Sequence, residues 1–448
     1  MATPRTEGSP GATEDLDALR AEALAAVRRY AEVALAEDEF VPGKTIVAVG
    51  GRVIGAPELE ALTDASLDGW LTEGRFARDF SAAFAAVVGR SQALLVGSGS
   101  QANLLAVAGA TSHLHERPLV AGEEVITPAL GFSTTVGPLY QYGLVPVYVD
   151  VELDTLNPSL DTIAEAIGPR TRAILMAHCL GNPFDADGVA ALCREHDLVL
   201  IEDCCDALGS TYGGRQVGTF GQAATFSFYP AHHMTTGEGG AVVADDATWQ
   251  RALRSLREWG RDCWCPPGVN DACGKRFEGR FGELPRGFDH KYVFSHVGFN
   301  FKVTDMQASL GLAQLERLEG FGARRRHNFA HLHEALTPLA DRLVLPRALP
   351  DADPSWFGYP FTLREGTSDT RRDLQRFLLE RKVDNRLMLG GNLTRQPGFL
   401  GRMHRVSAAL ENADRVMDAS IWVGCYPGLS DAMVDWIAES ITAFVDRS

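Results

Sequence analysis

The sequence lacks long hydrophobic runs. Its 448 residues contain no stretch near the roughly 18 consecutive apolar residues that a membrane-spanning helix requires, so we expect no membrane span. Residues 1–14 are rich in Thr, Gly, Pro and Glu and have no apolar stretch behind basic residues, which predicts a disordered tail and not a secretory signal. We therefore expect a cytoplasmic protein.

Positive charge is also scarce. The formal net charge is −16 at pH 7, which argues against nucleic acid as a partner because that binding depends on basic patches. The composition, 45% hydrophobic and 22% charged, is typical of a globular enzyme, and the length allows a large domain and a smaller one. The lysines are Lys44, Lys275, Lys291, Lys302 and Lys382.

Short apolar runs alternate with helical segments in the middle of the chain. This pattern predicts an α/β fold with a large, mainly parallel, seven-stranded sheet and helices on both of its faces. We expect an N-terminal helical segment over residues 15–90, the large domain over 91–330 and a smaller C-terminal α/β domain over 331–448. The predicted strands are Ala93–Val96, Glu124–Thr127, Val145–Val149, Ala173–Met176, Leu198–Ile201, Ala224–Phe228 and Gly240–Val243.

Two short motifs follow predicted strands. The turn Gly97–Asn103 opens a helix, where glycines let backbone N–H groups approach a phosphate; a plain strand-to-helix turn is an equal alternative. Asp203 follows the run Leu198–Ile201, so its carboxylate lies at the edge of the sheet where ligands bind. There it could keep a pyridine nitrogen protonated, as vitamin B6 chemistry requires, or cap the next helix.

A third motif, residues 227–240, gives a more specific signal. Its sequence, Ser-Phe-Tyr-Pro-Ala-His-His-Met-Thr-Thr-Gly-Glu-Gly-Gly, resembles the signature of the DegT/DnrJ/StrS sugar aminotransferase family of fold type I pyridoxal phosphate (PLP) enzymes. The segments 128–135, 298–302 and 306–308 match further parts of the family's pattern, in the family's order. The resemblance implies a homodimer with shared active sites.

This resemblance also implies roles for residues around the cofactor. Asp203 would bind the pyridine nitrogen, Phe132 would stack on the ring, and Asn300 would reach the phosphate held by a neighbouring subunit. The other phosphate ligands would be Gly99, Ser100 and Ser227.

His232 stands where the family places the lysine that binds the cofactor covalently. Imidazole cannot tether the aldehyde form of the cofactor, but it moves protons near neutral pH. The amine form, pyridoxamine 5′-phosphate (PMP), therefore suits this site. It would condense with a sugar ketone, and His232 would remove a proton while a hydroxyl leaves the neighbouring carbon. The alternative is a plain core histidine, and the adjacent His233 is expected to point elsewhere.

The eight cysteines of a cytoplasmic chain do not predict disulfides. Cys263 and Cys265, with Cys273 close behind, favour a soft metal, and Cys205 would complete a set of four thiolates. Zinc and an iron–sulfur cluster both accept such a set, so the spacing leaves the metal open. The expected core cysteines are Cys179, Cys193, Cys204 and Cys425.

The cysteine spacing, with a histidine between the first two, resembles the iron–sulfur branch of the family, the NDP-4-keto-6-deoxyhexose 3-dehydrases. This implies a [2Fe–2S] cluster on the four thiolates and a ferredoxin- or flavin-type reductase as electron donor. The expected reaction removes the C3 hydroxyl of an NDP-4-keto-6-deoxy or 2,6-dideoxy sugar, with Arg395 as a candidate ligand of the diphosphate or a solvated loop residue. The alternatives are a glutamate-recycling dehydratase or aminotransferase with structural zinc, and a non-catalytic regulatory protein.

Overall fold

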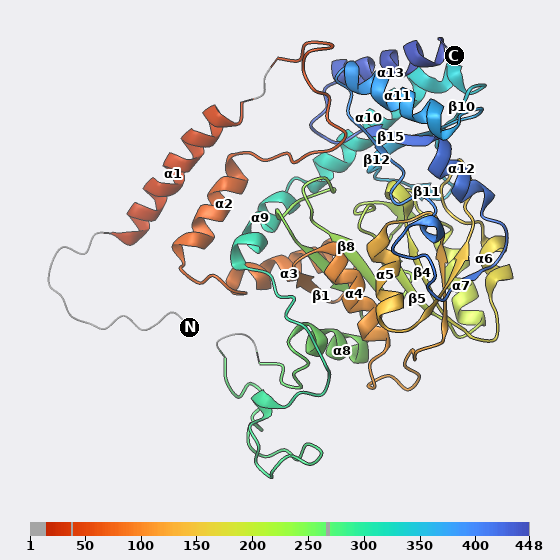
Figure 1. Cartoon of the computed structure of the whole chain (residues 1–448). Coiled ribbons are helices and arrows are strands. Elements are labelled where there is room, and N and C mark those ends of the chain that lie inside the picture. The colour runs from red at the N-terminus through yellow and green to blue at the C-terminus, as the bar shows by residue number, and fades with distance from the viewer. Residues whose placement is uncertain (1–14, 37–38, 266–268, 448) are drawn as a thin grey trace.

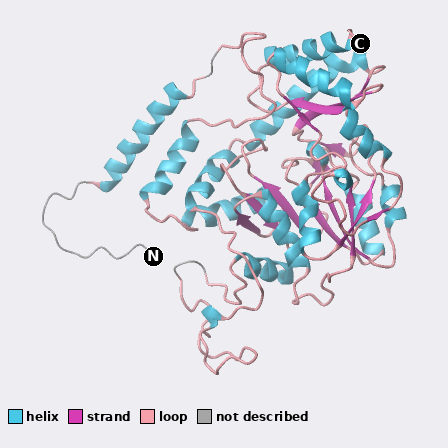
Figure 2. Cartoon of the chain, viewed as in Figure 1, coloured by secondary structure: helices cyan, strands magenta, loops and turns pink. Residues whose placement is uncertain are grey.

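One large sheet forms the centre of the protein (Figures 1 and 2). The computed structural model describes residues 15–36, 39–265 and 269–447, and the predicted disordered tail, residues 1–14, lies outside them. The strands follow the order β1 (Ala93–Val96), β9 (Gly240–Val243), β8 (Ala223–Ser227), β5 (Val199–Asp203), β4 (Thr171–Ala177), β2 (Glu124–Pro128), β3 (Val145–Val149) and β14 (Arg405–Val406).

The strand directions bring several loops to one edge of this sheet. The strands from β14 to β8 are parallel, and β9 is antiparallel to both β8 and β1. The carboxyl ends of β1, β5 and β8 therefore lie at the same edge, where ligands of such sheets bind. The prediction of a large, mainly parallel sheet is confirmed, and its seven expected strands are present. The eighth strand, β14, was missed because two residues give no periodic pattern.

Alternate residues of each strand contact different hydrophobic cores, so helices cover both faces (Figure 2). Leu175 and Ile201 pack in a core with residues of α4, α5 and α8, whereas Ile174 and Leu200 pack in a core with residues of α6 and α7. The bounds of these helices are α4 (Gly99–Ala110), α5 (Ser133–Gln141), α6 (Leu160–Ala166), α7 (Ala186–Glu195) and α8 (Ala247–Arg257).

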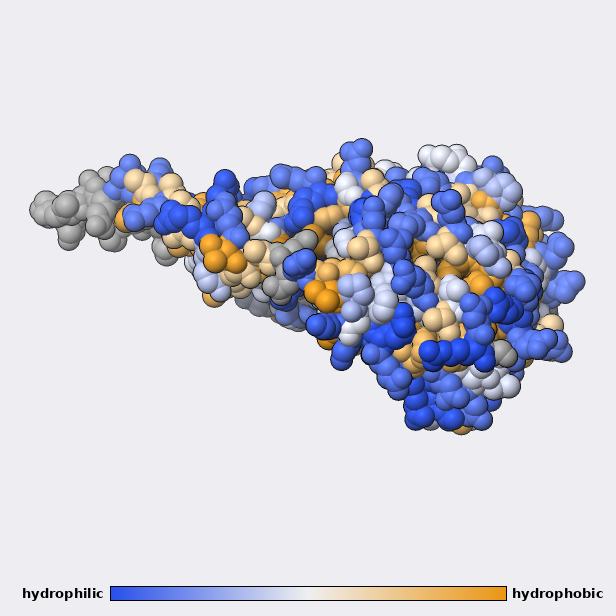
Figure 3. Space-filling view, turned by 90° about the horizontal axis from the view of Figure 1, so that it is seen from above, coloured by the Kyte–Doolittle hydropathy of each residue, from blue (hydrophilic) through white to orange (hydrophobic). Residues whose placement is uncertain are grey.

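Three helices precede the sheet, and a smaller antiparallel sheet follows it. The N-terminal helix α1 packs on α2, which packs on α9, and α1 extends to one side of the body (Figures 1 and 3). The smaller sheet has the order β10–β12–β15–β13. The bounds are α1 (Leu16–Ala34), α2 (Ala56–Leu67), α3 (Arg75–Val87), α9 (Asp305–Leu315), α10 (Leu318–Leu336), β10 (Leu343–Val344), β12 (Gly358–Leu363), α11 (Ser368–Glu380), β13 (Asn385–Leu387), α12 (Glu411–Ala419), β15 (Ser420–Gly424) and α13 (Asp431–Val445).

A third, three-stranded sheet has the order β11 (Ala352–Asp353), β6 (Thr211–Tyr212) and β7 (Arg215–Gln216). On the face shown in Figure 3, apolar surface is divided into patches among hydrophilic residues. Among the residues that the structure describes, no helix has both the length and the apolarity needed to cross a bilayer.

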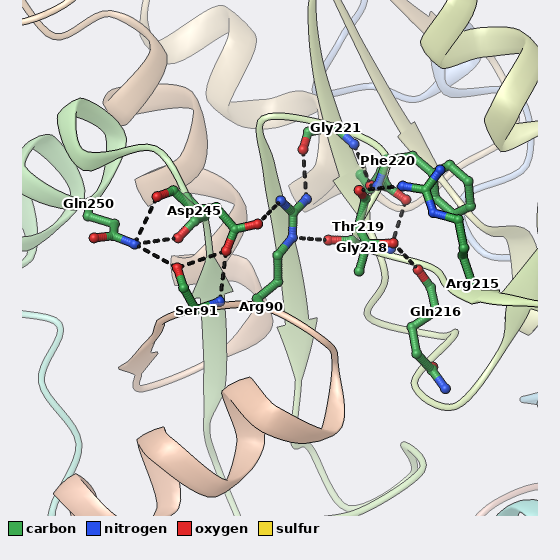
Figure 4. Close-up of polar contacts among 12 residues, drawn as sticks. Arg90, Ser91, Arg215, Gln216, Gly218, Thr219, Phe220, Gly221, Asp245 and Gln250 are labelled. Atoms are coloured by element: carbon green, nitrogen blue, oxygen red, sulfur yellow. Dashed lines mark hydrogen bonds and ion pairs between the residues drawn. The ribbon is translucent and has the colours of Figure 1, made fainter.

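A buried carboxylate and an arginine hold the loop that enters β8. Glu202, on β5, accepts backbone N–H groups of Gly218 at 2.7 Å and of Phe220 and Gly221 at 2.8 Å. The carbonyls of Gly218 and Gly221 in turn accept hydrogen bonds from Arg90, which also pairs with Asp245 at 2.8 Å (Figure 4). This network closes the amino-terminal edge of β1 and β8.

We expect Arg90→Ala to lower the free energy of unfolding by about 2–4 kcal/mol, because the substitution removes the side-chain donor of two carbonyls and the ion pair with Asp245, which keeps its hydrogen bonds from Ser91. The guanidinium is 7% exposed, so water replaces it poorly. Arg78→Ala is the control, because the Arg78 side chain is 73% exposed and its ion pair, among the described residues, is with its neighbour Asp79. Urea unfolding of the three proteins checks the difference, and equal losses for both variants would contradict a stabilising role for the network.

Candidate active site

A cavity of about 600 Å³ lies at the carboxyl edge of the large sheet. It collects residues from the ends of β4, β5 and β8, from the start of α4 and from the C-terminal part of the chain, as expected for a ligand site in this type of sheet. The predicted site residues that line it are Gly99, Ser100, Phe132, Asp203, Cys205, Ser227 and His232. The predicted residues outside it are Cys263, Cys265, Cys273, Asn300 and Arg395.

The first wall is the start of α4. Ser98 caps this helix by accepting the backbone N–H of Gln101 at 3.1 Å, and Gly99 and Ser100 of its first turn, where helix N–H groups lack partners within the helix, line the cavity. A Cβ atom at Gly99 would lie 2.5 Å from Cβ of Ser227 and 3.0 Å from Sγ of Cys205. Glycine is therefore the residue that leaves room for a phosphate at the positive end of the helix.

We expect Gly99→Ala to weaken PMP binding by about 10- to 100-fold, because the added methyl overlaps Ser227 and shifts the first turn of α4. Gly320→Ala is the control, since a Cβ atom there has no neighbour within 4 Å. Titration of each protein with PMP, followed by absorbance, gives the affinities. Equal binding by the Gly99 variant would contradict a close approach of the cofactor at this turn.

Asp203 forms the second wall and is 4% exposed. Its Oδ2 accepts hydrogen bonds from Asn103 at 2.8 Å and Thr135 at 2.7 Å, and its Oδ1 accepts the backbone N–H of Cys205 at 3.1 Å. Every partner is a donor, so the carboxylate is fixed in place and oriented as an acceptor. A buried carboxylate with this orientation fits the ring nitrogen of a pyridoxal-type cofactor.

His232 lies across the cavity in the loop after β8. Its Nδ1 lies 3.4 Å from Oδ1 of Asp206, and its ring lies 5.1 Å from that of Phe357. Arg325, which is fully buried, donates to the backbone carbonyl of His232 at 3.0 Å. The imidazole therefore has a carboxylate beside one nitrogen and the cavity on its other side, an arrangement that suits proton transfer.

His233 points away from the cavity, as the sequence predicts. It is 2% exposed, and its Nε2 lies 2.6 Å from the carbonyl of Ser355. Burial, with the nearby positive charge of Arg325, holds the pKa of His233 well below its usual value. The side chain is therefore a neutral structural donor.

We expect acid to destabilise the protein through His233. Below pH 6.5 the unfolded chain binds a proton that the buried imidazole does not, so the free energy of unfolding falls as pH falls, by up to about 1.4 kcal/mol per pH unit. His233→Gln keeps a donor for Ser355 but does not titrate, so its decline should be shallower. Unfolding curves from pH 7 to pH 5 check this, with His404→Gln as control. A decline as steep as that of the parent would contradict it.

The C-terminal part of the chain closes the cavity with a cation and aromatic rings. Arg386, on β13, lines the cavity and pairs with Asp384, and Trp422, on β15, donates to the carbonyl of Leu387 at 2.9 Å. Arg395 instead lies outside the cavity and pairs with Asp414 at 3.1 Å. Of the two arginines, Arg386 thus has direct access to a ligand.

Asn300 lies on the segment that precedes α9. It is exposed and accepts a hydrogen bond from Lys302 at 2.7 Å. The resemblance predicts that it reaches the phosphate of a neighbouring subunit, and its position outside this chain's cavity leaves that prediction open. Among the described residues, none of the five lysines lines the cavity.

The four cysteines predicted to bind metal lie in two places. Cys205 lines the cavity, whereas the other three lie between α8 and α9, where backbone N–H groups of Cys265 and Ala272 donate to Sγ of Cys263 and Cys265 at 3.5 and 3.3 Å. Such N–H donors stabilise thiolates in metal sites. Within the described part of the chain, no three of the four sulfurs lie within 4.8 Å of one another. The thiols fit a soft metal chemically, and Cys205 and Cys265 line different hollows of the chain.

Sequence reasoning missed several polar residues of the cavity, among them Asn103, Thr135, Asp206 and Arg386. Asn103 and Thr135 lie inside motifs already identified, but their contact with Asp203 depends on how α4 and α5 meet β5. Asp206 lies three residues after Asp203. Its acidic side chain so close to the predicted site was the signal in the sequence that could have identified it. Arg386 carries no local signal, because the small sheet brings it to the cavity.

Comparison with known proteins identifies the family. Residues 53–442 match the model of the DegT/DnrJ/EryC1/StrS aminotransferase family. The chain belongs to this family. It is 49% identical over 441 residues to a Saccharopolyspora spinosa protein named dTDP-4-dehydro-2,6-dideoxy-D-glucose 3-dehydratase, covering 98% of this chain and 94% of that one. It is 48% identical over 427 residues to the lipopolysaccharide biosynthesis protein RfbH of Salmonella typhimurium, covering 95% and 98% of the two chains.

A solved structure shows the same fold. The Escherichia coli GDP-4-keto-6-deoxy-D-mannose-3-dehydratase with bound hydrated PLP matches with a TM-score of 0.80 and 28% identity, covering 89% of this chain and 100% of that one. The predicted family and fold type are confirmed. The relatives include PLP enzymes that act on nucleotide sugars, among them 3-dehydratases.

Proposed function

We propose that this protein is a PMP-dependent 3-dehydratase of an NDP-4-keto-6-deoxy or 2,6-dideoxy sugar. The observation that carries the proposal is the cavity itself: it has His232 where the family has lysine, and none of the described lysines lines it. A covalent resting state through lysine is therefore absent from the described site, and a diffusible amine cofactor suits it. The named 3-dehydratases among the relatives support the same reaction.

When bound, PMP supplies an amine for the sugar ketone and a ring that accepts electrons. His232 would act as the base, because its Nδ1 faces Asp206 and its Nε2 is left to accept a proton in the cavity; with PMP bound, this proton transfer would accompany departure of the C3 hydroxyl. Asp206, 3.4 Å from Nδ1, stabilises the imidazolium that forms. Asp203 holds the proton on the ring nitrogen.

The remaining residues bind and orient. The first turn of α4, with Gly99 and Ser100, and Ser227 at the end of β8 hold the phosphate, and Phe132 stacks on the ring. Arg386 is the better candidate for the nucleotide diphosphate because it faces the cavity, with Arg395 further out. In a homodimer, Asn300 would contact the phosphate held by the other subunit.

The proposal includes a [2Fe–2S] cluster on the four cysteine thiolates and a ferredoxin- or flavin-type reductase that supplies electrons. Such a cluster would pass electrons singly to the dehydrated sugar. An absorbance spectrum of anaerobically purified protein tests this part. Bound zinc without iron–sulfur bands, together with turnover that depends on glutamate, would favour a glutamate-recycling dehydratase instead.

We expect His232→Asn to bind PMP as the parent does but to lose about 10²- to 10⁴-fold in the rate of sugar dehydration, because the proton acceptor is gone. Solvent deuterium exchange at C4′ should fall in parallel. His404→Asn, on the surface segment before β14, should leave both rates unchanged. If His232→Asn dehydrates as fast as the parent, the proposed base is wrong. If the parent binds PMP but dehydrates no CDP- or dTDP-linked 4-keto sugar, a regulatory role replaces the enzymatic one.

A further inference from the structure

An arm, residues 259–265 and 269–297, leaves the body between α8 and α9 and returns to the same point. At its base the backbone N–H of Trp259 donates to the carbonyl of Phe299 at 2.5 Å, and that of Phe299 donates to Leu256 at 2.6 Å. Figure 1 shows the arm projecting beyond α8, away from the C-terminal part of the chain. Cys263, Cys265 and Cys273 all lie on this arm.

The arm holds its thiols far from the fourth cysteine of the same chain. Cys265 lines a surface hollow with Ala93 and Leu94, at the start of β1, whereas Cys205 follows the end of β5. Two strands, β9 and β8, lie between β1 and β5. At the usual strand spacing, β1 and β5 are therefore about 14 Å apart. A cluster holds all its thiolates on one small core, so a single chain supplies three of its four positions.

Cys205 is nevertheless the thiol available to complete the set. It is half-buried and opens into the cavity, beside the first turn of α4. The remaining cysteines are buried in the hydrophobic cores: Cys179, Cys193, Cys204 and Cys425.

The arm and the cavity mouth both expose apolar side chains. On the arm, Tyr292, Phe294 and Val297 are 54%, 55% and 96% exposed. At the mouth, Phe132 and Tyr229 are 53% and 51% exposed. Each copy carries both surfaces, so in a two-fold dimer the arm of each copy could cover the cavity mouth of the other. Two-fold symmetry is the usual form of a homodimer.

We propose that the metal centre is completed between two copies of this chain. The arm of one copy supplies Cys263, Cys265 and Cys273, and the cavity of the other supplies Cys205. Two equivalent centres then form in each dimer, each beside the cofactor cavity of the copy that provides Cys205. The inference rests on the metal centre included in the proposed function.

A mixed dimer tests the proposal directly. One chain carries Cys205→Ser and the other carries Cys273→Ser, with different affinity tags, and the mixed dimer is isolated anaerobically after co-expression. Shared centres leave one intact set of four thiols in the mixed dimer, because wild-type Cys205 and the wild-type arm come from opposite chains. We expect half the iron and half the iron–sulfur absorbance of the parent, and almost none in either variant homodimer. Cys193→Ala, in a buried core, should keep the full amount.

Other outcomes would overturn the proposal. A mixed dimer with no more iron than the variant homodimers would show that each chain builds its own centre. Full iron in Cys205→Ser, with loss in His290→Ala, would assign the fourth ligand to His290. Nδ1 of His290 lies 3.8 Å from Sγ of Cys273, and its Nε2 lies 2.9 Å from Oδ2 of Asp262. His290 is therefore the best candidate on the same arm to replace Cys205 as the fourth metal ligand.

A second measurement does not depend on metal or activity. In metal-free parent protein treated with diamide, which oxidises thiol pairs, we expect a disulfide-linked dimer on a non-reducing gel. The linked dimer should disappear in Cys205→Ser and persist in Cys193→Ala. A linked dimer that survives loss of Cys205, or a monomer by sedimentation, would overturn the shared centre. Dehydration assays of the same samples report on the proposed function separately.

Discussion

Two consecutive carboxylates at the end of β5 hold the structure together around the cavity. Their side chains leave opposite faces of the strand. Burial alone would raise the pKa of Glu202, but His178 and the backbone N–H donors outweigh it, so the pKa lies below its usual value and the group stays charged. Asp203 joins α4 through Asn103 and α5 through Thr135. A change at Asp203 therefore frees α4 and α5 from the sheet edge, whereas a change at Glu202 frees the loop that enters β8.

The cavity divides its chemistry between two parts of the chain. In the proposed reaction, the groups that would hold charge and move protons, Asp203, Asp206 and His232, lie at the edge of the large sheet. The small sheet supplies Arg386 and Trp422 to the cavity. In the proposed complex these two residues would contact the part of the substrate that extends beyond the cofactor. If this division holds, the parallel sheet sets the reactivity, and differences in the small sheet would change the sugar or the nucleotide that binds.

The sequence predicted the elements that depend on local pattern. The seven expected strands are present because each is a short apolar run between turns, and the cofactor motifs lie at the carboxyl edge because parallel strands share that edge. Asp206 and Arg386 were missed because tertiary packing, and no local pattern, brings them to His232 and the cavity. The separation of Cys205 from the other cysteines was equally invisible, since spacing along the chain does not report distance across a sheet.

The short strand β14 has a consequence for synthesis of the protein. It pairs in parallel with β3, and the side chain of its Arg405 donates a hydrogen bond to the carboxylate of Glu124, which lies 281 positions earlier in the chain. While the ribosome is still making the last part of the protein, β3 remains an open edge with unpaired backbone groups. The outer edge of the large sheet is thus covered only after nearly the whole chain has been made, and until then it can pair with strands of other chains.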